Sequence, residues 1–375
     1  MRRACILASI CLLTVVTSCG GPAEPSRTVP IITSITPNSG TTLGGTVITI
    51  TGTNFPAGAS VSLGGTPATD VTTTGPTAIT AKTGQRASGV VDVVVTAGGA
   101  VATLPAGFTY TAPNAVVNTP PIVASMSARG TRGGEPAQFA DVGEEIDVVA
   151  TVQDAETPVS QLTYDWTSTA GGTFSGSGAA VKWRAPQTAG TPLTVMLTLT
   201  VIERYSAFDS NGLPITSENR VSKAIAVSLH DSVAEVGGMA RQFLVDFSDS
   251  NIRDVNYIMR NFTDTTSVCA KGTASETSDV KHNRDTFRIT SSAVGPADVI
   301  VSFGGRCPFR DTPADACAEV AVDWVSTILA DGTREHAWGT DQVTAIYVPT
   351  EQRWGLCASD FNGHNSPATR RDFIR

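Results

Sequence analysis

Alternating apolar and polar residues divide the chain into two strand-rich regions and a mixed third region. In the first region, period-two patterns run through residues 46–52, 60–63 and 91–95, with Gly-Gly and Pro turns between them. Such alternation is typical of half-buried strands, and several short strands joined by turns favour a β-sandwich. We therefore expect an all-β domain over residues 30–111, followed by a linker over residues 112–119.

A second all-β domain is predicted over residues 120–229. Its longest alternating run is LTVMLTLTV at residues 193–201. Trp166 and Trp183 lie in shorter strand patterns, and we expect both indoles in the core. The stretch 203–219 is interpreted as an inserted hairpin loop, for which a plain exposed loop and a contact with a partner are both open.

Helical periodicity first appears after residue 230. Val236, Met239 and Phe243 belong to a run of apolar residues at three- and four-residue intervals, and Ser232 with Glu235 forms a capping box. A second short helix is indicated over residues 252–262, and strand patterns follow from residue 286 onward. Helices followed by a curved antiparallel sheet predict an α+β domain over residues 230–375.

The first region carries several spaced motifs of one family. They are ITPNSG at 35–40, GGT at 44–46, ITGTNF at 50–55, LGGTPA at 63–68 and FTY at 108–110. In this order they resemble the IPT/TIG family of immunoglobulin-like domains, and the resemblance covers the whole region. It implies a sandwich that serves as a spacer or binding module and contributes no catalytic residues.

The other two regions resemble further families. VQDAE at 152–156, LTYDW at 162–166 and VKWRAP at 181–186 are similar to PKD-like domains, which implies a second immunoglobulin-like sandwich. The opening helix of the third region, its Asp331-Gly332 turn and its closing hairpin over 347–357 resemble the nuclear-transport-factor-2-like proteins. That family includes ketosteroid-isomerase and polyketide-cyclase relatives, and the resemblance implies a cone with a hollow end.

The N-terminus has the layout of an export signal. Arg2 and Arg3 precede a short apolar run, and VTSC at 16–19 resembles a bacterial lipobox. This implies a signal peptide over residues 1–18, acylation (palmitate) of Cys19, and a flexible tether over residues 19–29. Alternatives are a buried N-terminal helix and an ordinary secretory signal. We expect a lipid anchor in the cell envelope, at the outer membrane.

Charge narrows the classes of partner. The formal net charge of the 375-residue chain is −8, and it becomes more negative if Arg2 and Arg3 leave with the signal. An acidic protein is poorly suited to binding nucleic acid, so no nucleic-acid partner is expected. Beyond the signal, no run of about 18 apolar residues predicts a transmembrane helix.

Four of the seven cysteines lie in the last third of the chain, at Cys269, Cys307, Cys317 and Cys357. An even number in one region of an exported protein favours two disulfides, for which three pairings are possible. We favour Cys307 with Cys317 and Cys269 with Cys357. Zinc binding is the competing interpretation, although the chain has no C-x-x-C pair near these residues and its histidines are scattered.

Carboxylates supply the candidate metal and catalytic residues. Asp154, Glu156 and Asp165 are calcium candidates if they converge at one end of the second sandwich, and otherwise are solvated turn residues. Asp246 and Asp323 sit among apolar neighbours and are candidate general bases. The alternative is that they cap helices, pair with arginines or face solvent. No hydrolase, nucleotide or zinc-protease motif is present, and no other cofactor is predicted.

These features favour a lipid-anchored bacterial surface protein whose sandwiches present a C-terminal binding domain. A glycan, an envelope protein or a small apolar molecule is the expected partner. One alternative is an enzyme that performs proton transfer or hydrolysis on a hydrophobic substrate, and a second is an adhesion or envelope-scaffold stalk. A pocket with an ionisable group at its base would favour the enzyme, whereas a cone filled by Phe243, Trp324 and Trp338 would argue against it.

Overall fold

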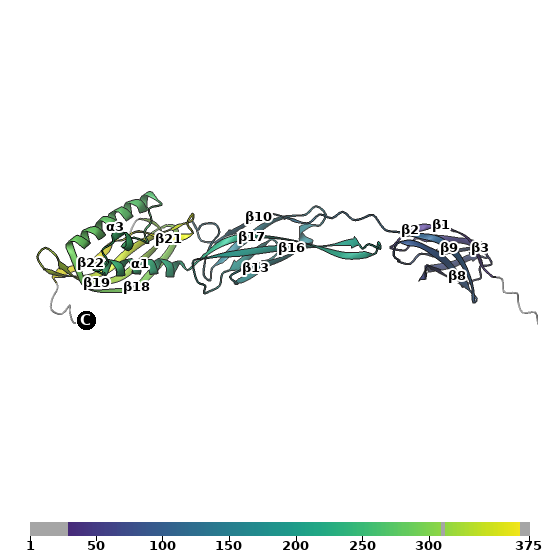
Figure 1. The fold of residues 1–375 in the computed structure, drawn as a ribbon, viewed down its shortest axis with the longest axis horizontal. Helices are drawn as coiled ribbons and strands as arrows, with labels where there is room; N and C mark the ends of the chain where they lie inside the picture. Colours follow the sequence, from purple (N-terminus) through teal and green to yellow (C-terminus); the bar gives the residue numbers. More distant parts are fainter. Residues whose placement is uncertain (1–28, 309–311, 368–375) are drawn as a thin grey trace, which may run out of the picture. The chain divides into compact units, whose positions relative to one another are not determined.

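The computed structural model describes residues 29–308 and 312–367, most of which lie in β-strands (Figure 1). The predicted signal peptide, the lipidation site Cys19 and nearly all of the tether lie outside the described residues. The chain forms two compact units, one comprising residues up to 117 together with 206–217, the other residues 118–205 and those from 218 onward. In the part that is described, no helix is long and apolar enough to cross a membrane.

The first domain contains two sheets whose inward side chains alternate as the sequence predicts. The strand order of the first sheet is β1 (Ile31–Thr36), β3 (Val47–Thr53), β7 (Ala78–Lys82), β6 (Thr69–Gly75). The strand order of the second sheet is β2 (Ser39–Thr41), β9 (Ala100–Thr111), β8 (Gly89–Ala97), β4 (Ser60–Leu63), β5 (Thr66–Pro67). Ile48, Ile50 and Leu63 are fully buried, and the rings of Phe108 and Tyr110 meet edge to face at 5.0 Å. Burial of these alternate side chains stabilises the sandwich.

The second domain is also built from two four-stranded sheets. Their orders are β10 (Ile122–Arg129), β12 (Glu145–Gln153), β15 (Ala180–Arg184), β14 (Thr173–Ser177) and β11 (Phe139–Asp141), β17 (Pro214–His230), β16 (Leu193–Phe208), β13 (Thr163–Ser168), with a 3-10 turn at Val159–Gln161. Trp183 is fully buried, as predicted. Trp166 is only half-buried, because β13 is the last strand of its sheet and no further strand covers its side.

The predicted inserted hairpin is the extension of β16 and β17, and its tip belongs to the first unit. Asp209 Oδ1 shapes the turn by accepting hydrogen bonds from the backbone N–H groups of Asn211 (2.9 Å) and Leu213 (2.8 Å). The carbonyl oxygen of Asn211 accepts a hydrogen bond from Ser88 N at 2.8 Å. The tip is therefore held by the rest of its unit, unlike a plain exposed loop.

Three helices and five strands follow the second sandwich. The helices are α1 (Ser232–Ser248), α2 (Val255–Ile258) and α3 (Ser267–Thr286), and the sheet order is β18 (Phe287–Arg306), β19 (Pro313–Ile328), β20 (Arg334–Val348), β21 (Arg353–Ala358), with β22 (Phe361–Pro367) also paired to β20. Helix α1 packs on β18 and β19, and α3 packs on β21. The resemblance to a nuclear-transport-factor-2-like cone stays a prediction.

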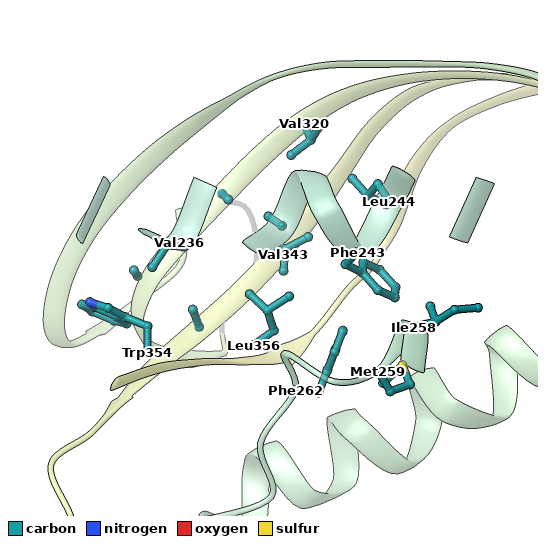
Figure 2. Packing of buried hydrophobic residues seen from close by; sticks show 14 of the residues in the cluster. Val236, Phe243, Leu244, Ile258, Met259, Phe262, Val320, Val343, Trp354 and Leu356 are labelled. Carbon is teal, nitrogen blue, oxygen red and sulfur yellow. The ribbon is translucent and has the colours of Figure 1, made fainter. Parts of the chain in front are cut away.

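The core of this domain lies between α1, α2 and the inner face of the sheet (Figure 2). The members labelled in Figure 2 come from α1, from the segment around α2 and from the sheet: Val236, Phe243, Leu244, Ile258, Met259, Phe262, Val320, Val343, Trp354 and Leu356. Val280 of α3 and Phe139 of β11 belong to the same core. Because α1 buries one stripe of apolar residues, its periodicity was visible in the sequence.

The start of α1 differs from the predicted capping box by one residue. Asp231 is the N-cap, and its side chain accepts a hydrogen bond from Ala234 N at 3.0 Å. Glu235 returns a bond to the backbone by accepting from Asp231 N at 3.1 Å. The hydroxyl of Ser232, the residue predicted as the cap, instead donates to Asp141 Oδ1 at 2.6 Å.

Helix α3 was not predicted, because the apolar spacing that marks α1 is missing from it. Only a few of its side chains, among them those of Cys269 and Val280, are buried, and the rest of the helix is largely polar. Its N-cap is Thr266, whose Oγ1 accepts a hydrogen bond from Cys269 N at 3.1 Å. Further along the helix, Val280 is fully buried in the core of the domain, and Arg284 donates a hydrogen bond to the backbone oxygen of Asp246.

Both disulfides are present with the favoured pairing. Cys269–Cys357 joins the first turn of α3 to β21, and Cys307–Cys317 joins the end of β18 to β19. The first closes a loop with a sequence separation of 88 residues, and the second closes one of 10. The four cysteines are therefore used as covalent ties between elements.

A buried charge cluster lies where the second sandwich meets the C-terminal domain. The guanidinium of Arg132 forms ion pairs with Glu135 (2.6 Å), Asp141 (2.8 Å) and Glu144 (2.8 Å). Its central carbon lies 5.0 Å from the ring centroid of Phe303 in β18. Burial, together with the neighbouring carboxylates, raises the pKa of Glu144 to about 7, although Arg132 opposes this shift.

We expect Glu144→Gln to reduce the pH dependence of stability. Because the folded state raises this pKa from 4.5, the carboxyl contributes stability that is fully present below pH 4.5 and is lost as the pH rises through about 7. Urea unfolding at pH 5.5 and pH 8 should show the unmodified protein losing roughly 1 kcal/mol more unfolding free energy than the variant over this interval. Equal losses in the two proteins would contradict the assignment.

Removing the long-loop disulfide should destabilise the C-terminal domain more than removing the short one. Loop-closure entropy gives about 4.5 kcal/mol for Cys269→Ala/Cys357→Ala and about 2.5 kcal/mol for Cys307→Ala/Cys317→Ala. Denaturant unfolding of the two double variants measures both values under one condition. A larger loss for the Cys307/Cys317 variant would show that chain entropy is not the dominant contribution.

Candidate functional site

A cavity of about 350 Å³ remains in the C-terminal domain, bounded by helices and the inner face of the sheet. Helix α1 supplies Phe243, Leu244 and Phe247, and β19 supplies Trp324 and Ser326. The other lining residues come from α3 (Glu276, Asp279, Asn283, Arg284), β18 (Phe287, Ile289), β20 (Glu335, Ala337, Asp341), the two residues before β22 (Ser359, Asp360) and β22 itself (Phe361, Asn365). The volume lies at the lower end of the usual range for small-molecule sites.

One wall of the cavity is a row of aromatic rings. Phe247 lies 5.5 Å from Trp324 and 6.2 Å from Phe243, measured between ring centroids. Trp324 in turn lies 5.5 Å from Phe361. The indole is fixed in orientation because its Nε1 donates a hydrogen bond to Ser248 Oγ at 2.7 Å. This wall offers a preorganised apolar surface to a ligand.

Hydrogen-bonding groups make up much of the rest of the lining, and some adjoin the rings, since Asp341 is paired with Phe361 in the sheet. Ser359 donates through its backbone N–H to Glu276 (3.2 Å) and through its hydroxyl to Asp341, so both carboxylates are held in place. Arg284 donates to the backbone oxygen of Asp246 at 2.8 Å, while its Nε is buried without a hydrogen-bond partner. Burial lowers the pKa of Arg284. A buried donor of this kind gains a hydrogen bond if a ligand oxygen reaches it.

The two candidate general bases are not part of this cavity. Asp246 lies on α1, almost fully buried, where it forms an ion pair with Arg260 and accepts a hydrogen bond from Gln242 at 3.0 Å. Asp323 lies on β19 with half of its side chain exposed and contacts His336 Nε2 at 2.8 Å. Asp246 therefore pairs with an arginine and Asp323 faces solvent, which were the alternatives to a role as general base.

The calcium candidates do not converge. Asp154 Oδ1 accepts hydrogen bonds from the backbone of Glu156 and Thr157, which makes it a turn residue. Glu156 contacts Thr119, and Asp165 is exposed on β13. Among residues 29–308 and 312–367, no group of three or more His, Cys, Asp and Glu side chains is arranged to hold a metal ion.

The three aromatic residues named as possible fillers of the cone lie in different places. Phe243 and Trp324 are buried in the core and also line the cavity. Trp338 does not line it, and instead contacts the rings of His336 (4.6 Å) and His364 (5.8 Å). An open volume with ionisable groups in its wall therefore persists beside the packed core.

Sequence reasoning missed the polar wall, because four of its residues lie on the unpredicted α3. Thr266 followed by a long stretch without Pro was the available signal for a helix start. The sequence pattern could not predict that this helix lines the same cavity as the aromatic residues of α1 and β19.

The comparisons place one domain in a family. Residues 30–112 match the IPT/TIG domain model, which confirms that prediction for the first domain. No curated protein matches the chain.

Several solved structures show low similarity. The extracellular region of plexin A4 is 19% identical, with 43% of this chain and 13% of that chain covered and a TM-score of 0.20. SGBP-B from a complex xyloglucan utilization locus in Bacteroides uniformis is 13% identical, with 84% of this chain and 66% of that chain covered and a TM-score of 0.19. SGBP-B from the Bacteroides ovatus mixed-linkage glucan utilization locus, in complex with a mixed-linkage heptasaccharide, is 14% identical (54% and 45%, TM-score 0.17). The chain spans less than two thirds of each, and TM-scores of this size establish no shared fold.

Alanine substitutions at two helical glycines should change the stability in opposite directions, because only Gly272 lies at the close approach of α3 to β21. A Cβ at Gly272 would collide with the carbonyl oxygen of Cys357, whereas a Cβ at Gly238 in α1 would meet nothing within 4 Å. We expect Gly272→Ala to lower the unfolding free energy by about 1–3 kcal/mol. The matched control Gly238→Ala should raise it by about 0.5–1 kcal/mol through helix propensity. Denaturant unfolding measures both, and equal effects would contradict the close packing.

Proposed function

We propose that the chain is a lipid-anchored cell-surface protein whose C-terminal domain binds a glycan in the cavity between α1, α3 and the sheet. The observation that carries this proposal is the combination of an aromatic row with hydrogen-bonding groups in the lining of one cavity of about 350 Å³. A sugar ring has apolar C–H faces and a polar rim of hydroxyls, and it needs a surface of each kind.

The aromatic row suits the faces of a sugar ring. Phe247 and Phe361 are half-buried, so part of each ring is available to the cavity, and Trp324 between them is fixed by Ser248. Rings held in one orientation lose little conformational entropy when a ligand stacks on them.

The hydrogen-bonding groups of the lining suit the hydroxyls. The carboxylates of Glu276, Asp279 and Asp341 accept hydrogen bonds, and the amide of Asn283 both donates and accepts. Arg284 adds a buried donor in its Nε. Donors and acceptors side by side match a hydroxyl, which itself both donates and accepts.

The surrounding architecture fits presentation of such a site at a membrane surface. The lipobox-like VTSC motif would anchor the chain through Cys19, and the two sandwiches would serve as spacers. The order of three helices and a five-stranded sheet supports an α+β cone of the nuclear-transport-factor-2-like kind for the C-terminal domain.

Catalysis at the same cavity is the second candidate. Asp341 is almost fully buried in its wall and bonded to the Ser359 hydroxyl, and a buried carboxylate can act as a general base. Release of reducing ends from a bound oligosaccharide by the unmodified protein, and its loss in Asp341→Asn, would favour an enzyme over a binding protein.

We expect Phe247→Ala and Phe361→Ala each to weaken glycan binding by about tenfold, because each removes a ring face from the aromatic row. Isothermal titration of the full chain with neutral and charged oligosaccharides measures the dissociation constants. Trp338→Ala is the matched control, since it removes an aromatic ring that does not line the cavity. If Trp338→Ala weakens binding as much as the two Phe variants, the cavity is not the site.

A further inference from the structure

A second aromatic recess lies on the side of the second sandwich, where both sheets end. Strand β13 is the last strand of one sheet and β14 is the last strand of the other. Between them lies an open groove of about 740 Å³. Tyr164 and Trp166 of β13 and Phe174 of β14 line it. Because the two edges meet here, unpaired backbone groups of both strands border the same recess.

The rings of this groove are held in place by hydrogen bonds to the backbone. Trp166 Nε1 donates to the Gly178 carbonyl at 3.0 Å, and the Tyr164 hydroxyl donates to the Val159 carbonyl at 2.8 Å. Trp166 and Phe174 are stacked, with centroids 6.0 Å apart and planes 29° from parallel. All three rings are half-buried, so each packs against the core and still reaches the groove. They form a preorganised aromatic floor.

The lining of the groove carries no charged side chain. Its polar groups are the hydroxyls of Ser160, Thr163 and Ser177, together with the backbone at Gly176 and Gly178. The C-terminal cavity differs sharply, since five carboxylates and one guanidinium line it. A charged ligand would lose its hydration in this groove without gaining an opposite charge.

We propose that this groove is a second binding site, specific for a neutral saccharide chain. The sugar rings stack on Trp166 and Phe174, and their hydroxyls bond to Ser160, Thr163 and Ser177 and to the backbone of the two edge strands. The second sandwich is then a binding module as well as a spacer, and this site stands independently of the C-terminal cavity.

A peptide strand added to β13 or β14 is the competing occupant, because exposed edges can pair with another chain. The observations favour a saccharide. The edges are short, with six residues in β13 and five in β14, and Gly176 at φ +95° departs from extended geometry. A fixed aromatic floor matches sugar rings, whereas strand addition depends chiefly on regular backbone spacing.

The test uses the full chain carrying Phe247→Ala, so that the C-terminal cavity contributes little. Cellohexaose, mannohexaose and maltohexaose are the neutral probes, and hexagalacturonic acid is the charged probe of equal length. We expect at least one neutral probe to bind and to change Trp fluorescence, with hexagalacturonic acid at least tenfold weaker. Trp166→Ala and Phe174→Ala should each weaken the neutral complex at least tenfold. Failure of all three neutral probes to bind overturns the proposal.

Two further variants test whether the groove itself holds the saccharide. Thr163→Arg places a long charged side chain at an exposed position of the lining and should abolish binding while leaving the thermal unfolding midpoint unchanged. Trp338→Ala should bind as the parent does. Binding that survives Thr163→Arg overturns the proposal. Hydrogen exchange gives a second test: if an added peptide protects the β13 and β14 amides and the saccharide does not, the proposal is also overturned. The same groove substitutions are also made in the chain that keeps Phe247. If Phe247→Ala by itself abolishes binding there, while Trp166→Ala and Phe174→Ala leave binding unchanged, the proposal is overturned and only the C-terminal cavity is supported.

Discussion

A covalent tie between a largely polar helix and an apolar sheet shapes the C-terminal domain. Helix α3 has few apolar side chains to bury, so the hydrophobic effect alone attaches it weakly. The Cys269–Cys357 disulfide and the close approach of Gly272 fix its first turns to β21. Its later turns line the cavity with polar groups, and the guanidinium of Arg284 lies 5.9 Å from the ring centroid of Phe247.

The buried cluster around Arg132 joins the second sandwich to the C-terminal domain by a mixture of ring packing and charge. Phe139 of β11 stacks on His230 at 5.0 Å and meets Tyr347 of β20 at 4.8 Å, so the cores of the two domains are continuous. The guanidinium lies near the rings of both Phe139 and Phe303 and forms ion pairs with three carboxylates. Removing one member of a buried ion pair is costly, because it leaves an uncompensated charge.

The cavity and the groove use aromatic rings in different electrostatic settings. In the cavity the rings face carboxylates and a partly unsatisfied guanidinium, whereas in the groove they are bordered by hydroxyls and backbone groups. Aromatic faces supply contact area in both places, and the polar surroundings determine which ligand is accepted. Trp166 is half-buried, and not in the core as predicted, because it lies on an edge strand.

The sequence by itself determined the strand-rich sandwiches, the amphipathic helix α1, the IPT/TIG domain and the pairing that its cysteines favour, because period, turn residues and motif spacing are local properties of the chain. It did not reveal α3, whose polar surface leaves no periodic signal, and it placed Asp246 and Asp323 among candidate bases. Only the tertiary structure paired Asp246 with Arg260 and turned Asp323 toward His336. The tertiary structure also brought Glu276 and Asn283 into the lining of the same cavity as Phe247, since residues distant along the chain meet only through packing.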